Sequence, residues 1–171
     1  MIYVGTVSKT LSPALRLGYL VVPGPLIDVF TRCKQIADRH SPTLEQEALA
    51  ILLEAGSYER HVRRMRRSNA ERRAALMTAL ASSFGEQIEI VGTSAGLHVV
   101  VWFREIGAQH EARLIETARA AGIGIYPVSP LYLERKPDLA GIVLGYASLT
   151  PDELREGTEK LASAVHGFAE I

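Results

Sequence analysis

The sequence has one cysteine, few aromatic residues and no excess of charge, and these shortages exclude several classes of protein. Cys33 is the only cysteine among 171 residues, so the chain cannot form an internal disulfide, and a reducing cytoplasm is its natural setting. The 19 basic residues balance the 19 acidic ones, so net charge favours neither nucleic acid nor anionic membrane. The chain also has no apolar run of membrane-spanning length. We therefore expect a cytoplasmic protein without membrane or direct nucleic-acid contact from this segment.

The composition and length of the chain are those of a folded domain. Hydrophobic residues make up 47% of the chain and charged residues 22%, a balance typical of globular proteins and not of disordered ones. A length of 171 residues suits one domain, or one domain with a small appendage.

The stretch from Gly5 to Tyr19 has the most informative chemistry. It places Lys9 among small hydroxylated residues, with Arg16 seven positions later. The hydroxylated residues are Thr6, Ser8, Thr10 and Ser12. Lysine forms a Schiff base with an aldehyde cofactor, and hydroxyl and guanidinium groups donate hydrogen bonds to phosphate. From the residues alone, the stretch indicates a lysine beside an anion site, and a polar turn with a solvated lysine is the alternative.

The full string resembles the cofactor-lysine segment of fold-type-I pyridoxal-phosphate enzymes. It is most similar to the aminotransferase-like domain of the MocR branch of GntR-family transcriptional regulators. The resemblance continues in four further segments, which are Ser41–Gln46, His61–Arg73, Ala95–His98 and Leu144–Ala147. It therefore covers nearly the whole chain.

The resemblance assigns roles to individual residues. Lys9 corresponds to the lysine that carries the pyridoxal phosphate as a Schiff base, which makes it the candidate catalytic residue. Thr6 and Arg16 correspond to the residues that hold the cofactor phosphate, and Ser8 lies beside them. No residues are predicted to bind a metal.

The resemblance also implies a fold. We expect an α/β protein with an α+β small lobe, forming the C-terminal part of a fold-type-I transferase. Residues 1–56 are predicted to be a remnant of the large cofactor-binding domain. Residues 57–83 are predicted to form a long interdomain helix, and residues 84–171 a small domain with a mostly antiparallel sheet packed against helices.

The patterns of apolar residues, glycines and prolines predict the order of the elements. The predicted strands are 2–7, 16–22, 88–91, 97–103, 123–127 and 141–146. The predicted helices are 26–40, 43–54, 57–83, 109–121 and 151 to the C-terminus. Thr150 and Glu153 are expected to form a capping box. His98 is more simply structural than catalytic, and Trp102 is most simply a core residue.

Two departures from the family pattern affect the functional prediction. Val143 stands where aminotransferases of this fold carry the arginine that binds the substrate carboxylate, which argues against ordinary transamination. Arg104 or Arg135 could replace that arginine from a loop, but nothing in the sequence indicates that either side chain points towards the substrate. Tyr132 is a candidate ligand contact, because its loop corresponds to the family's ligand pocket. Asn69 replaces a tyrosine of the pattern.

The arginine-rich segment 60–73 invites a nucleic-acid interpretation. The balanced net charge and the absence of interleaved aromatic residues argue against it, and we expect these charges to pair with acids or to be solvated.

Three functions remain open. The chain could be part of a regulator's effector domain that senses a small amine or amino acid through Lys9, part of a class I/II aminotransferase, or a cofactor-free module. The chain begins directly on the strand before Lys9, so we expect a longer parent protein, because the ring-stacking aromatic and the pyridine-pairing acid lie upstream in the family. The isolated chain is then expected to show little catalysis, and its uncovered strands to favour self-association, with a homodimer in the family.

Overall fold

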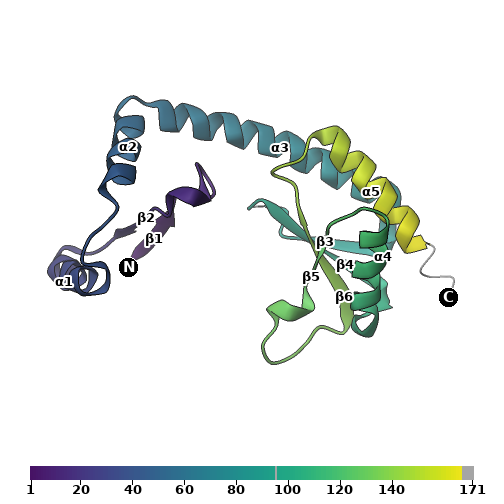
Figure 1. Ribbon diagram of the computed structural model, residues 1–171. Helices are drawn as coiled ribbons and strands as arrows, with labels where there is room; N and C mark the ends of the chain where they lie inside the picture. Colours follow the sequence, from purple (N-terminus) through teal and green to yellow (C-terminus); the bar gives the residue numbers. More distant parts are fainter. Residues whose placement is uncertain (95, 167–171) are drawn as a thin grey trace. The chain divides into compact units, whose positions relative to one another are not determined.

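A computed structural model describes residues 1–94 and 96–166 of the protein. Ala95, which belongs to one of the resembling segments, and residues 167–171 of the predicted last helix lie outside the described residues. The chain divides into two compact units, Met1–Arg67 and Ser68–Ile171 (Figure 1).

The N-terminal unit consists of a hairpin and helices. The hairpin pairs strand β1 (Tyr3–Thr6) with strand β2 (Gly18–Val21) in antiparallel register. The helices are α1 (Ile27–Asp38), α2 (Thr43–Glu54) and the first part of α3 (Ser57–Phe84). The two strands and three helices predicted for this part of the chain are present, and the two strands pair as a hairpin. Helix α2 has no side-chain cap, because Pro42 occupies its N-cap position.

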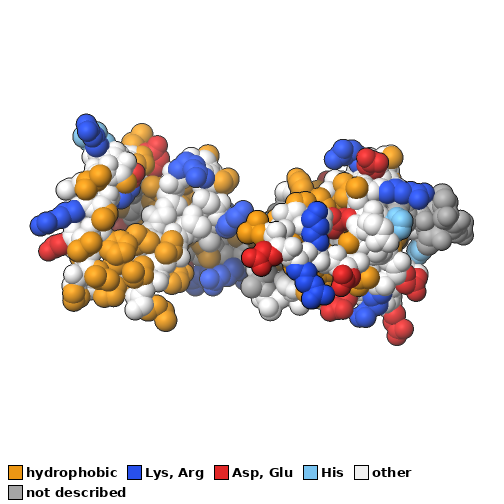
Figure 2. Space-filling view, turned by 90° about the horizontal axis from the view of Figure 1, so that it is seen from below, with side chains coloured by type: hydrophobic (Ala, Val, Ile, Leu, Met, Phe, Trp, Pro, Cys, Tyr) orange, Lys and Arg blue, Asp and Glu red, His pale blue; other side chains and the backbone are white. Residues whose placement is uncertain are grey.

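Little of the N-terminal unit is buried. Val7 and Leu17 are its only buried residues among those that the structure describes. Large apolar side chains lie exposed on β1, β2, α1 and α2, and they gather on the surface of this unit (left in Figure 2). The exposed set includes Ile2, Tyr3, Val4, Tyr19, Leu20, Val21, Leu26, Ile27, Val29, Ile36, Leu44, Ile51 and Leu53. The composition of these elements therefore suits a buried environment that the described residues do not provide.

The C-terminal unit is built on an antiparallel sheet with strand order β3-β4-β6-β5. The strands are β3 (Ile88–Val91), β4 (His98–Gly107), β5 (Tyr126–Pro127) and β6 (Leu139–Gly145). The helices of this unit are the second part of α3, α4 (Glu111–Ala120) and α5 (Pro151–His166). This is the predicted α+β lobe with an antiparallel sheet.

Alternation along the strands gives the sheet two different faces. Val99, Val101 and Phe103 of β4 are buried and join a core with residues of all three helices, including Leu80, Leu114 and Leu161. His98, Val100 and Trp102 alternate with them and point to the opposite face. Trp102 is therefore only half-buried, and the prediction that it belongs to the core is wrong.

The largest differences from the predicted strand boundaries in this unit are in β4 and β5. Strand β4 continues to Gly107 past a register shift between Trp102 and Gly107, which a pattern of alternating residues cannot foresee. Strand β5 is limited to Tyr126 and Pro127, because only these two residues pair with β6.

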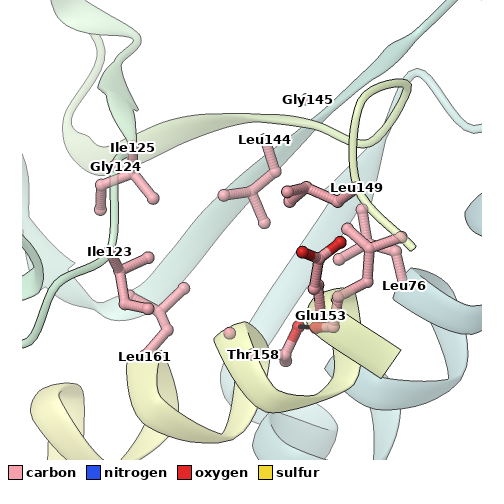
Figure 3. Close-up of a pocket in the computed structure, with 12 residues that line it drawn as sticks. Leu76, Ile123, Gly124, Ile125, Leu144, Gly145, Leu149, Glu153, Thr158 and Leu161 are labelled. Carbon is pink, nitrogen blue, oxygen red and sulfur yellow. Dashed lines mark hydrogen bonds between the residues drawn. The ribbon is translucent and has the colours of Figure 1, made fainter. Parts of the chain in front are cut away.

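A small apolar cavity of about 80 Å³, partly open to solvent, lies between β6 and α5 of this unit (Figure 3). Leu144 of β6 and Leu161 of α5 face it (Figure 3). Gly157 of α5 also lines it. None of the helices in residues 1–94 and 96–166 is long and apolar enough to cross a membrane.

Candidate functional site

Lys9 lies in the loop that connects β1 to β2. The hairpin register pairs Gly5 with Tyr19 and Thr6 with Gly18. The Tyr19 ring lies against Gly5 so closely that a Cβ atom there would be 2.2 Å from the ring, so any larger residue would force the ring to move. A side-chain hydrogen bond with Tyr3, together with the charge interaction between the two hydroxyl groups, raises the pKa of Tyr19. The paired strands thus fix the two ends of the lysine loop.

Backbone hydrogen bonds give the loop a defined shape. The Val7 amide donates to the Leu17 carbonyl oxygen at 3.2 Å, which extends the pairing beyond the strands. The Leu11 amide donates to the Val7 carbonyl oxygen at 2.8 Å and so closes a turn around Lys9. Ser12 then caps the short 3-10 turn Pro13–Leu15 by accepting a bond from the Ala14 amide at 3.2 Å.

The hydroxyl groups of Thr6 and Ser8 lie together at the start of the loop. Their oxygen atoms are 3.0 Å apart, and the Ser8 amide donates to Thr6 Oγ1 at 3.2 Å. Thr6 Oγ1 also lies 3.1 Å from the Leu17 carbonyl oxygen. Two of the predicted phosphate-binding residues are therefore adjacent.

The side chains of Lys9 and Arg16 are exposed on the same loop. No hydrogen bond or ion pair joins either side chain to another described residue. Arg16 has a left-handed backbone, with φ 52° and ψ 30°, at the end of the 3-10 turn. This conformation is uncommon for a residue other than glycine, and it ends the turn so that β2 starts at Gly18 and not at the predicted residue 16.

Two residues of α3 hold the far side of the loop, and sequence reasoning gave neither of them this role. The Tyr58 hydroxyl lies 2.7 Å from Thr10 Oγ1, and His61 Nε2 lies 3.0 Å from the Thr10 carbonyl oxygen. Tyr58 and His61 are one helical turn apart and share a face of α3. That spacing was visible in the sequence, but the partner residue in the loop was not.

The predicted ligand contact Tyr132 lies in the C-terminal unit, where it lines an open hollow of about 330 Å³. Trp102 and residues 135–139 form the rest of its wall. On the same face of the sheet, Val143 is two residues along β6 from Gly141, the cross-strand partner of Trp102. Arg104 instead pairs with Glu89 at 3.5 Å, so of the two replacement arginines only Arg135 lines the hollow.

The arginines of α3 are only partly paired with acids. Arg63 forms an exposed ion pair with Glu59 at 2.9 Å. Arg73 donates to the Thr93 carbonyl oxygen at 2.7 Å, and Arg72 donates to Asn69 at 3.2 Å. Asn69, the residue that departs from the family pattern, thus anchors a neighbouring arginine. Within the described part of the chain no cluster of His, Cys, Asp or Glu could hold a metal ion.

The fold is that of an aminotransferase-like protein. Two solved structures share the fold over 99% of the chain. One is the alpha-aminoadipate aminotransferase LysN from Thermus thermophilus, complexed with N-(5'-phosphopyridoxyl)-L-leucine, with a TM-score of 0.83 and 27% identity. The other is the multiple substrate aminotransferase from Thermococcus profundus, with a TM-score of 0.85 and 25% identity. The chain covers 43% and 41% of these two proteins.

The chain belongs to the aminotransferase class I and II family, whose model matches residues 1–161. It is 35% identical to the HTH-type transcriptional regulator YhdI of Bacillus subtilis. It is also 35% identical to MocR of Rhizobium meliloti, named as a probable rhizopine catabolism regulatory protein. Each match covers 96% of the chain, which spans about a third of the length of these relatives. The predicted fold class and the resemblance to MocR-type regulators are confirmed.

Proposed function

We propose that the chain is the C-terminal portion of an aminotransferase-like effector domain of a transcriptional regulator. This domain binds pyridoxal phosphate and senses a small amine or amino acid through Lys9. The loop from Val7 to Leu17 carries the proposal, because it presents Lys9 together with the hydroxyl pair of Thr6 and Ser8. The likeness to HTH-type regulators supports the regulatory role. We also place the protein in the cytoplasm as a homodimer.

The residues of the loop fit the cofactor chemically. A phosphate needs several hydrogen-bond donors, and two adjacent hydroxyls with one guanidinium supply them. The turn closed between Val7 and Leu11 presents the Lys9 amine to solvent, where an aldehyde can reach it. Pyridoxal phosphate, when bound, supplies an aldehyde carbon and an electron-accepting ring.

Each residue of the site has a separate role in the proposed sensing of the ligand. Thr6, Ser8 and Arg16 would hold the cofactor phosphate, and the Lys9 amine would hold its aldehyde end, which is also the group that an incoming amine can engage. The contacts of Tyr58 and His61 with Thr10 hold the lysine loop against α3. A change in the loop therefore reaches α3, which continues into the C-terminal unit, and this is the proposed path from ligand binding to a signal.

A Lys9→Ala variant tests the proposal. The wild-type chain with added pyridoxal phosphate should develop a visible absorbance band, and Lys9→Ala should abolish it. Lys34→Ala is the matched control, because Lys34 is an exposed lysine on α1 that pairs only with Asp38. An unchanged band in Lys9→Ala, or an equal loss in Lys34→Ala, would contradict the assignment.

A class I/II aminotransferase is the second candidate, because LysN shares the fold and 27% of the residues. Val143 on β6 weighs against it, since valine cannot bind a substrate carboxylate. A transamination assay of the parent protein with pyridoxal phosphate, several amino acids and a keto acid distinguishes the two, because the regulator hypothesis predicts no sustained turnover.

A further inference from the structure

The hollow beside Trp102 combines an aromatic face with two cations. Arg135 and Lys136 line it together with Trp102, Tyr132 and Leu139, and its volume of about 330 Å³ is at the lower end for ligand pockets. The Trp102 ring lies over Gly141, where an added Cβ atom would be 2.6 Å from the ring. Because a larger residue at 141 would push the indole aside, the glycine keeps the ring flat along the sheet.

The cations of the hollow are available to a ligand. Arg135 pairs with Asp138 at 3.8 Å, and both side chains are about nine-tenths exposed, so the pair contributes little. Lys136 has no ion-pair partner among the described residues. Glu89, on the neighbouring strand β3, is paired with Arg104. The hollow therefore carries two positive charges and one weakly engaged carboxylate.

A buried carboxylate holds together the two ends of the loop that carries these cations. Glu111, at the start of α4, is only 3% exposed. Its Oε1 atom accepts bonds from the Gly141 amide at 3.2 Å and the Ser129 amide at 3.3 Å, and the Ser129 hydroxyl donates to its Oε2 atom. The Val128 amide also donates to the Gly141 carbonyl oxygen at 2.9 Å. Residues 129–140 thus leave and return at one fixed point, as compact functional loops do.

We propose that this hollow binds a small carboxylate with a flat apolar body. Arg135 and Lys136 bind the carboxylate, and the indole of Trp102 with Leu139 covers the apolar part. Val143 lies on the same face of the sheet, so the two loop cations can stand in for the arginine that this strand position lacks. The anion site belongs to the C-terminal unit alone and does not depend on the function proposed for Lys9.

The fluorescence of Trp102 tests the proposal directly, because it is the only tryptophan in the chain. Benzoate added at low salt, without pyridoxal phosphate, should change the emission with saturation. Benzamide lacks the charge and acetate lacks the flat body, so each should bind about tenfold more weakly or worse. Equal effects of benzoate and benzamide, or no saturable change with benzoate, would overturn the proposal.

Paired charge removals locate the site. The variant R135Q/K136Q should weaken benzoate binding about tenfold or more. The variant R155Q/K160Q removes the same charge from exposed positions on α5 and should bind benzoate like the wild type. Both variants change exposed side chains, and circular dichroism checks that they fold. Unchanged binding in R135Q/K136Q, or an equal loss in R155Q/K160Q, would overturn the assignment. Because the assay needs neither Lys9 nor cofactor, its result is independent of the pyridoxal-phosphate test.

Discussion

Arg16 combines a left-handed backbone with a guanidinium that we assign to the cofactor phosphate. A non-glycine residue in this conformation costs about 1–2 kcal/mol, and such strain often lies at ligand sites. The structure offers a second arginine with positive φ, Arg39, which ends α1 and has no assigned role. Comparing the two positions therefore separates the effect of a positive φ on stability from the effect of the arginine side chain on cofactor binding.

Replacing Arg16 with glycine should relieve the strain and remove the phosphate ligand. We expect Arg16→Gly to keep the midpoint of thermal unfolding at or above the wild-type value and to weaken pyridoxal-phosphate binding about tenfold, because charged hydrogen bonds are lost. Calorimetry and an absorbance titration measure the two quantities. Arg39→Gly is the control, with the same substitution at another positive-φ position (φ 54°, ψ −48°), and it should leave the cofactor affinity unaltered. Wild-type affinity in Arg16→Gly would remove Arg16 from the site.

At the residue scale, the sequence showed local chemistry but not long-range partners. The adjacency of Thr6 and Ser8 could be predicted, since residues two apart in a strand end share a face. The bonds that Tyr58 and His61 make to Thr10 span about fifty residues, and the bonds of Glu111 join a helix to a loop and a strand. The spacing of apolar residues along the sequence does not predict contacts between residues so far apart. The side-chain roles of Lys9 and Arg16 stay predictions.

At the element scale, a glycine within a helix is a position where substitution should raise the stability of the chain. Gly157 lies inside α5 on the wall of the apolar cavity, and an added Cβ atom would meet no atom within 4 Å. Gly157→Ala should stabilise the chain by about 1 kcal/mol, because alanine favours the helix and the methyl group enters empty space. Urea unfolding measures the change, with Gly124→Ala as a cavity-lining control outside any helix. A loss of stability in Gly157→Ala would contradict this account of the cavity.

The capping box of α5 makes a pH-dependent contribution to the free energy of unfolding. Bonds from the Thr150 backbone and hydroxyl lower the pKa of Glu153 below its ordinary value of 4.5. Because the folded pKa is depressed, this contribution is present above pH 4.5 and is lost as pH falls through the folded pKa. Glu153→Gln should therefore be less stable than the wild type at neutral pH and approach it in acid. A constant difference in unfolding midpoint across this range would contradict the assignment.

Helices and strands were predicted where apolar patterns were long, and boundaries were missed where pairing decided them. The capping box at Thr150 and Glu153 was visible from residue types alone. The length of β4 and β5 depended on neighbouring strands, and the half-buried position of Trp102 depended on which face of the sheet the helices cover.

At the scale of the whole molecule, the two units differ in how well they are packed. The C-terminal unit has a continuous core, whereas only Val7 and Leu17 are buried in the described residues of the N-terminal unit. The hairpin of β1 and β2 is a two-stranded sheet, which is marginally stable by itself and leaves both outer edges open. The apolar side chains of this hairpin therefore favour pairing with another copy of the chain.

We expect the isolated chain to self-associate through this hairpin. Sedimentation velocity should show species larger than a monomer whose fraction grows with concentration. Val4→Lys places a charge on an exposed strand position and should reduce the association. Leu133→Lys is the control, because Leu133 is equally apolar and fully exposed in a loop of the C-terminal unit. A clean monomer at high concentration would contradict the expectation.

The central claim is that Lys9 binds pyridoxal phosphate, and covalent trapping tests it most directly. The chain is incubated with pyridoxal phosphate, reduced with borohydride and digested, and the modified peptides are identified by mass spectrometry. The other three lysines, Lys34, Lys136 and Lys160, serve as internal controls. The account predicts a phosphopyridoxyl group concentrated on Lys9. An adduct spread evenly over all four lysines, or none on Lys9, would contradict it.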